Sequence, residues 1–149
     1  MTYKEIENID LTEYLVNEDK PHGEEGRYGW GAGSQPEALK FYLDPSVVIL
    51  NEYCTGDYQG DVVTLFYIPA HRRFVLWRDS YGSCSGCDGL EDNNGYEYIK
   101  STLQEGSTRQ FRNIEDAKEY WATTDDYMWN ERPDLDAWFA EAKKKFEER

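Results

Sequence analysis

Two cysteines in a glycine-rich loop are the residues whose spacing most clearly indicates chemistry. They stand in the segment Tyr81-Gly-Ser-Cys84-Ser-Gly-Cys87-Asp-Gly89. Glycine before Cys87, and again two residues after it, lets the backbone turn tightly enough for two thiolates to converge on one metal ion. This is the geometry of a zinc knuckle, which supplies two of the four ligands of a structural zinc. The other ligands must come from elsewhere in the chain.

Three strands are the elements that would position those further ligands. β-Branched and aromatic runs separated by turn-rich segments predict a three-stranded antiparallel meander. The runs span 47–53, 62–68 and 74–79. In such a meander Cys54, Asp61 and Asp79 lie at the same end of the sheet as the cysteine loop, so we expect Cys54 to join Cys84 and Cys87 around zinc. The spacing leaves the fourth ligand open among Asp88, which directly follows Cys87, and Asp57, Asp79 and His22.

His71 is a poor fourth ligand, because a strand at about 3.3 Å per residue places its turn roughly 20 Å from the cysteines. Two other interpretations of the cysteines stay open. In one, Cys54 is a small buried hydrophobe and the Cys84–Cys87 pair has no chemical role. In the other, the pair is redox-active, although its glycines disfavour the helix that a thioredoxin-like motif requires.

Helices are predicted around this sheet. Apolar residues within 1–20 repeat at helical spacing, a capping box at Ser34 and Glu37 begins a second helix, and Asn113 is a predicted N-cap. The predicted helices lie within 1–20 and over 34–43, 96–105, 114–122 and 133–149. The last has an apolar stripe of Leu135, Trp138, Phe139, Ala142 and Phe146. We therefore expect one α+β domain over 1–149, with about five short helices on a small antiparallel sheet.

Charge and composition exclude several classes of protein. The 149 residues include 30 Asp and Glu against 16 Lys and Arg, which gives a net charge of −14 and argues against direct nucleic-acid binding. An aromatic content of 15% predicts a folded chain, although charge this high with few aromatics is typical of disorder. The sequence contains neither a long apolar run nor the pattern of a signal peptide. We expect a soluble cytoplasmic protein without a membrane partner.

The stretch 115–136 is the densest acidic region, with eight acids and two bases among aromatic residues. Such a surface fits a basic groove on a protein partner, where carboxylates replace phosphates and aromatic side chains are the buried anchors. The alternative is a solvated face around core aromatics. The residues predicted to contact a partner are Glu115, Asp116, Glu119, Asp125, Asp126, Trp129, Glu131 and Asp134.

Other chemistry is sparse. With two histidines and no motif that brings either one to a nucleophile, we expect no catalytic residues and no enzyme. The basic runs 71–73 and 143–145 are interpreted as a hairpin tip and the end of a helix, where the helix dipole favours cations. They do not predict a separate site for an anionic partner.

A resemblance gives the acidic surface a class of partner. The segment Gly56-Asp-Tyr-Gln-Gly60, the aromatic strand after it and the cysteine loop resemble short proteins of phages and other mobile elements. Small size, strong acidity and a predicted zinc site are similar to phage-encoded anti-CRISPR proteins, including inhibitors of Cas9. The resemblance implies stoichiometric inhibition of a Cas9-type effector in the host cytosol, because such effectors hold nucleic acid in a positively charged channel. The alternatives are a zinc-stapled interaction or immunity-type module with another target, and a small Cys-x-x-Cys redox enzyme.

Overall fold

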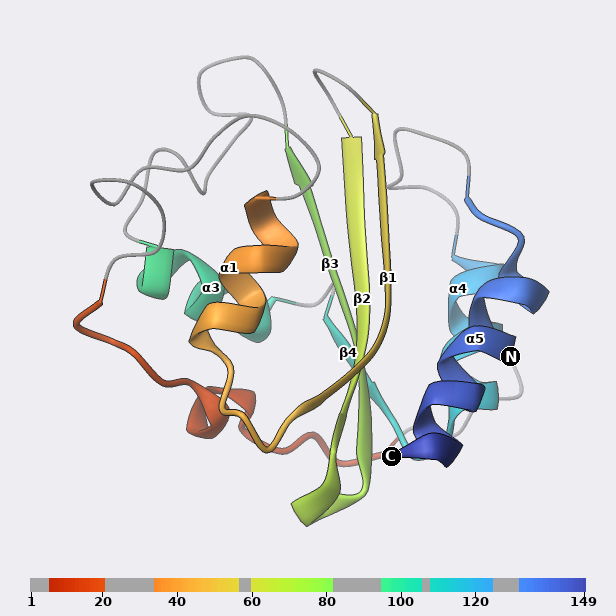
Figure 1. The fold of residues 1–149 in the computed structure, drawn as a ribbon, viewed down its shortest axis with the longest axis horizontal. Coiled ribbons are helices and arrows are strands. Elements are labelled where there is room, and N and C mark those ends of the chain that lie inside the picture. Colours follow the sequence, from red (N-terminus) through yellow and green to blue (C-terminus); the bar gives the residue numbers. More distant parts are fainter. Residues whose placement is uncertain (1–5, 21–33, 57–59, 82–94, 106–107, 125–131) are drawn as a thin grey trace.

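A computed structural model describes residues 6–20, 34–56, 60–81, 95–105, 108–124 and 132–149. Their elements are η1 (Leu11–Tyr14), α1 (Ser34–Tyr42), β1 (Val48–Gly56), β2 (Gly60–Ile68), η3 (Pro69–His71), β3 (Arg73–Tyr81), α3 (Gly95–Gln104), β4 (Arg109–Phe111), α4 (Ile114–Thr123) and α5 (Leu135–Glu148). They form three layers, with a four-stranded sheet between two pairs of helices (Figure 1). The α+β class is confirmed.

The sheet is antiparallel and its strands follow chain order, β1-β2-β3-β4. The predicted three-stranded meander is confirmed, and each of its strands is longer than predicted. β4 adds a short fourth strand beside β3, where Phe111 pairs with Phe74. Three residues are too few to show an alternating pattern, so the sequence alone did not indicate this strand.

Helices cover both faces of the sheet, and the side chains of β2 show why. Val62 and Phe66 are buried with α1 and α3, whereas Val63 and Leu65 are buried with α4 and α5. Successive residues of a strand point to opposite faces, so a strand covered on both sides is apolar throughout. The run 62–68 of β2, which is apolar or aromatic apart from the buried Thr64, therefore lies at the centre of a three-layer fold.

Four of the five predicted helices are confirmed. The Asn113 side chain caps α4 as predicted, accepting the N–H of Asp116 at 2.7 Å. The predicted stripe of α5 faces the sheet, with Trp138, Phe139 and Ala142 buried. These local signals predicted the helices correctly for two reasons. The cap gives a hydrogen-bond acceptor to a free backbone N–H at the start of α4, and the apolar stripe of α5 is buried in the core.

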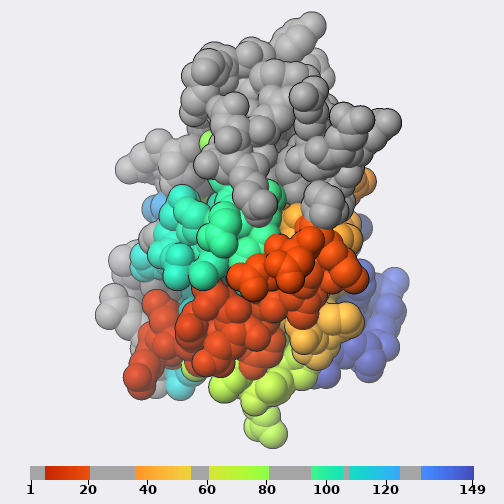
Figure 2. Space-filling view, turned by 90° about the vertical axis from the view of Figure 1, so that its left-hand side faces the viewer, coloured from red at the N-terminus to blue at the C-terminus, as the bar shows by residue number. Residues whose placement is uncertain are grey.

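The predicted N-terminal helix is wrong, because residues 6–20, the described part of this segment, form only the single turn of η1. Figure 2 shows the N-terminal segment lying across α1 and α3. Its backbone is held there by outside partners: Val16 N–H donates to Tyr42 O at 2.8 Å, and Ile9 exchanges two hydrogen bonds with the Gln110 side chain. The buried Leu11 reaches the core from this largely non-helical path. Apolar spacing gave the correct contacts but the wrong backbone conformation.

Candidate functional site

The end of the sheet where β1 turns into β2, called here the hairpin end, holds the described members of the predicted metal site. Cys54 pairs with Val62, and Val62 pairs with Asp79. Asp61 lies one row nearer the turn, paired with Ser80. The prediction that Cys54, Asp61 and Asp79 lie at one end of the sheet is confirmed.

Cys54 and Asp79 share a face of the sheet but are poorly placed to bind one ion together. Val62 lies between them in the sheet, and two strand spacings put their backbones about 9–10 Å apart. The Asp79 carboxylate is also engaged, since the Tyr98 hydroxyl donates to its two oxygens at 2.8 and 2.6 Å. To bind a metal ion, Asp79 would have to give up these hydrogen bonds.

The Cys54 thiol is partly buried against the core between the sheet and the α1/α3 layer. Burial raises its pKa to about 11, and the nearby Glu52 carboxylate adds to the rise. At neutral pH this thiol is protonated, so binding a metal ion through it would release a proton.

The other predicted ligands, namely Cys84, Cys87, Asp88, Asp57 and His22, lie outside the described residues. Within the described ranges, no three His, Cys, Asp or Glu side chains come together as a metal site. His71 lies in η3, at the opposite end of β2 from the hairpin, with its ring against Tyr14 at 6.0 Å. This position agrees with the expectation that His71 is a poor zinc ligand.

The predicted acidic surface is described only in part. Glu115, Asp116 and Glu119 lie on α4, and Asp134 caps the start of α5. Opposite charges on α4 and α5 meet nearby: Lys143 lies 3.9 Å from Glu115, and Lys118 pairs with Asp136. The remaining predicted contacts, namely Asp125, Asp126, Trp129 and Glu131, are outside the described residues.

Two aromatic residues of this acidic stretch, Tyr120 and Trp121, are core residues, which corrects their interpretation as anchors for a partner; both pack near Trp138, which was predicted to face the core. Trp121 is fully buried, and Tyr120 and Trp138 are each 6% exposed. The Trp121 and Trp138 rings meet edge to face at 5.0 Å between centroids. Helical spacing from Ile114 would have indicated this, since Ala117 and Trp121 continue the same face of α4. For these side chains the solvated-face alternative is correct.

Half of the net charge falls in three segments that lie outside the described residues. Segment 57–59 joins β1 to β2, and segment 82–94 follows the end of β3. Segment 125–131 joins α4 to α5; on these helices Trp121 contacts Tyr53, and the Trp138 indole donates to Glu52 O at 3.2 Å, both near the middle of β1. The sequences of these segments hold no Lys or Arg and seven acids: Asp57, Asp88, Glu91, Asp92, Asp125, Asp126 and Glu131.

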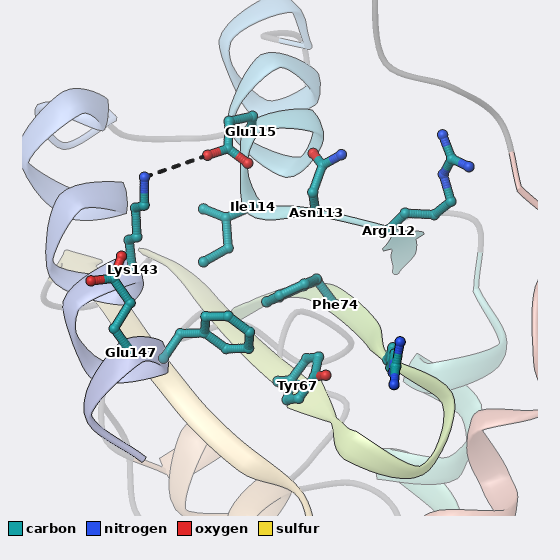
Figure 3. A pocket seen from close by; sticks show the side chains of 10 residues that line it. Tyr67, Phe74, Arg112, Asn113, Ile114, Glu115, Lys143 and Glu147 are labelled. Carbon is teal, nitrogen blue, oxygen red and sulfur yellow. Dashed lines mark ion pairs between the residues drawn. The ribbon is translucent and has the colours of Figure 1, made fainter.

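A pocket that the sequence did not indicate lies away from the hairpin end, where the β2–β3 turn meets α4 and α5. It has a volume of about 360 Å³. Figure 3 shows Phe74 and Tyr67 between Lys143 on one side and Arg112 on the other. The basic runs 71–73 and 143–145 each give it one residue, although they are far apart in sequence.

No protein-family model, curated protein or solved structure matches the chain. None of the helices in the described ranges is long and apolar enough to cross a membrane.

Proposed function

We propose that this protein is an anti-defence protein of phage or mobile-element type that binds a Cas9-type effector one to one and blocks nucleic-acid loading. The observation that carries the proposal is the concentration of charge in segments 57–59, 82–94 and 125–131, which contain seven acids and no bases. A dense negative charge complements a channel lined with arginine and lysine, where carboxylates take the place of phosphates.

The α4 side chains extend the proposed contact surface. Glu115, Asp116 and Glu119 lie on the helix that leads into segment 125–131, and Asp134 begins the helix that follows it. Both helices are held by a core of large aromatic rings, so the acidic residues at their ends start from fixed positions. A preformed surface loses less conformational entropy on binding than a disordered acidic tail would.

Binding without turnover fits the described side chains better than catalysis does. His71, the histidine within the described ranges, is exposed in a turn and contacts Tyr14. Without a bound metal ion, Cys54 carries a protonated thiol, which is a weak nucleophile, and the proposal assigns this side chain to zinc. The proposal therefore assigns no catalytic residue.

A structural zinc at the hairpin end is part of the proposal. Cys84 and Cys87 would supply the knuckle, with Cys54 and Asp88 as further ligands. The position of Cys54 in the last part of β1 supports this, because segment 82–94 leaves β3 at the same end of the sheet. Zinc there would link the acidic segment to the sheet and limit its conformations.

Native mass spectrometry tests the zinc. We expect one zinc ion per chain in protein purified without added metal, lost after treatment with a strong chelator. Cys84→Ser should abolish zinc binding and lower the free energy of unfolding by several kcal/mol, roughly 3 or more, because metal-binding energy is then folding energy. His71→Ala is the control and should keep its zinc. A metal-free mass, or a two-proton deficit from a disulfide, contradicts the zinc site, and the deficit would favour the redox alternative.

Isothermal titration calorimetry against a panel of guide-loaded Cas9-type effectors tests the partner. We expect one-to-one binding to at least one effector at about 50 mM salt, weakened at least tenfold at about 500 mM because salt screens exposed charges. Absence of binding to every effector at low salt contradicts the proposed partner. Binding that does not change with salt contradicts the charge-based mechanism and favours an interaction module of another kind.

A further inference from the structure

We infer that the pocket between the β2–β3 turn, the start of α4 and the second half of α5 binds a small planar anion. The ligand class is a ring-bearing carboxylate or phosphate, such as an aromatic acid or a mononucleotide. This site borders the acidic surface of the proposed function, and the two share Glu115. Its volume of about 360 Å³ falls in the range of roughly 300–1,000 Å³ that is usual for small-molecule sites.

The floor of the pocket is a preformed aromatic surface. Tyr67 and Phe74 lie on neighbouring strands, with ring centroids 4.7 Å apart, and both belong to the core. Phe146 of α5 meets them at 4.9 and 5.1 Å. Ile114 closes the side formed by α4 (Figure 3). Rings in mutual contact with the core do not need to rearrange for a ligand, and a planar ligand gains from offset or edge-to-face contact with them.

Cations surround this floor. Arg72, Arg112 and Lys143 line the pocket from three different elements. The Arg149 guanidinium adds a fourth positive charge, 4.7 Å from the Tyr67 ring centroid and 4.3 Å from that of Phe146. Two carboxylates, Glu115 and Glu147, oppose these four cations. The local net charge is therefore positive in a chain whose net charge is −14.

The backbone of Arg72 is a second, independent indication. Its φ of 51° and ψ of 48° are left-handed, at the position that ends η3. Arginine is disfavoured in this conformation, which glycine and asparagine adopt more easily. Arg72 therefore occupies a turn position where glycine or asparagine would be more stable. Backbone strain of this kind is found at binding sites.

The charges decide which ligand the rings can accept. Aromatic rings alone also attract cations, and Arg149 already lies against two of them. A second cation would meet the repulsion of Arg72, Arg112 and Lys143, whereas an anionic group would be drawn to them. A nucleic-acid strand is excluded by the negative charge of the whole chain, so the anion must be small.

The amide resonances of the isotope-labelled full-length protein report binding in an NMR titration. The probes are adenosine monophosphate and naphthoate, with adenosine, inorganic phosphate and choline as comparison compounds. We expect at least one ring-bearing anion to shift resonances of α4 and α5 around the pocket. Adenosine and phosphate should bind at least tenfold more weakly, because adenosine has no negative charge and phosphate has no ring. Which anion binds more tightly distinguishes a phosphate ligand from a carboxylate ligand.

Two substitutions separate binding from folding. Arg72→Asn keeps a residue that tolerates the left-handed turn but removes the charge, so we expect binding about tenfold weaker without a lower melting temperature. Lys143→Gln should weaken binding about tenfold, whereas Lys144→Gln, its exposed neighbour on α5 outside the pocket, should not. The inference is overturned if neither anion shifts these resonances, if choline binds more tightly than both, or if the Lys143 and Lys144 variants behave alike.

Discussion

Replacing the acids of segment 125–131 by amides is expected to weaken binding to the effector about 100-fold. The variant carries Asp125→Asn, Asp126→Asn and Glu131→Gln. Each substitution removes a charge that would meet a cationic side chain, and such a pair contributes about 1 kcal/mol. Three pairs give about 3 kcal/mol, which corresponds to about 100-fold in Kd. Isothermal titration calorimetry with the guide-loaded effector measures the change.

A matched control tests whether position matters as well as charge. Glu13→Gln, Glu18→Gln and Asp19→Asn raise the net charge by the same three units, from exposed positions in the N-terminal segment that packs with α1 and α3. We expect this variant to bind within about threefold of the unmodified protein, since its charges lie on the other side of the sheet from α4. Equal weakening in both variants would show that net charge alone governs binding.

Trp121→Ala is expected to lower the free energy of unfolding by about 3–5 kcal/mol. The ring is fully buried between α4, α5 and the sheet, where it contacts the rings of Tyr53, Trp138 and Phe139. Alanine would leave a cavity that these large neighbours cannot close. Because typical domains are stable by about 5–15 kcal/mol, a loss of this size removes much of the stability.

Urea denaturation, followed by far-ultraviolet circular dichroism, measures this loss. Lys144→Ala is the control, because this side chain is exposed on α5 and its removal should change the free energy of unfolding by less than about 0.5 kcal/mol. A Trp121→Ala protein that loses less than about 1 kcal/mol would contradict the assignment of α4 to the core and restore Trp121 as a candidate for partner contact.

Much of the fold was predictable because several elements are determined by residues close to one another in the sequence. Asn113 caps α4 through a bond to a residue three positions away, and the α5 stripe places Trp138 and Phe139 on one side of a helix. Both signals are local. The path of the N-terminal segment was not predictable, since it depends on hydrogen bonds to Tyr42 and Gln110, far along the chain.

The candidate sites also differ in how far they could be predicted from the sequence. The row that contains Cys54 and Asp79 followed from counting residues along a predicted meander, and the structure has that register. The cationic pocket could not be predicted, because Arg72 and Lys143 come together only once α5 packs across the sheet. Each basic run had a sufficient local explanation, as a turn tip or a helix end, so no sequence pattern connected the two runs.

A titration of DNA loading tests the central claim most directly. Labelled target DNA is added to a guide-loaded Cas9-type effector that has first been mixed with increasing amounts of this protein, and bound DNA is measured. The account predicts that loading falls in proportion to the protein added and ends near one equivalent, as expected for a tight one-to-one blocker. Unchanged loading at about tenfold excess and low salt would contradict binding in the DNA channel. Complete inhibition far below one equivalent would contradict stoichiometric action and indicate an enzyme.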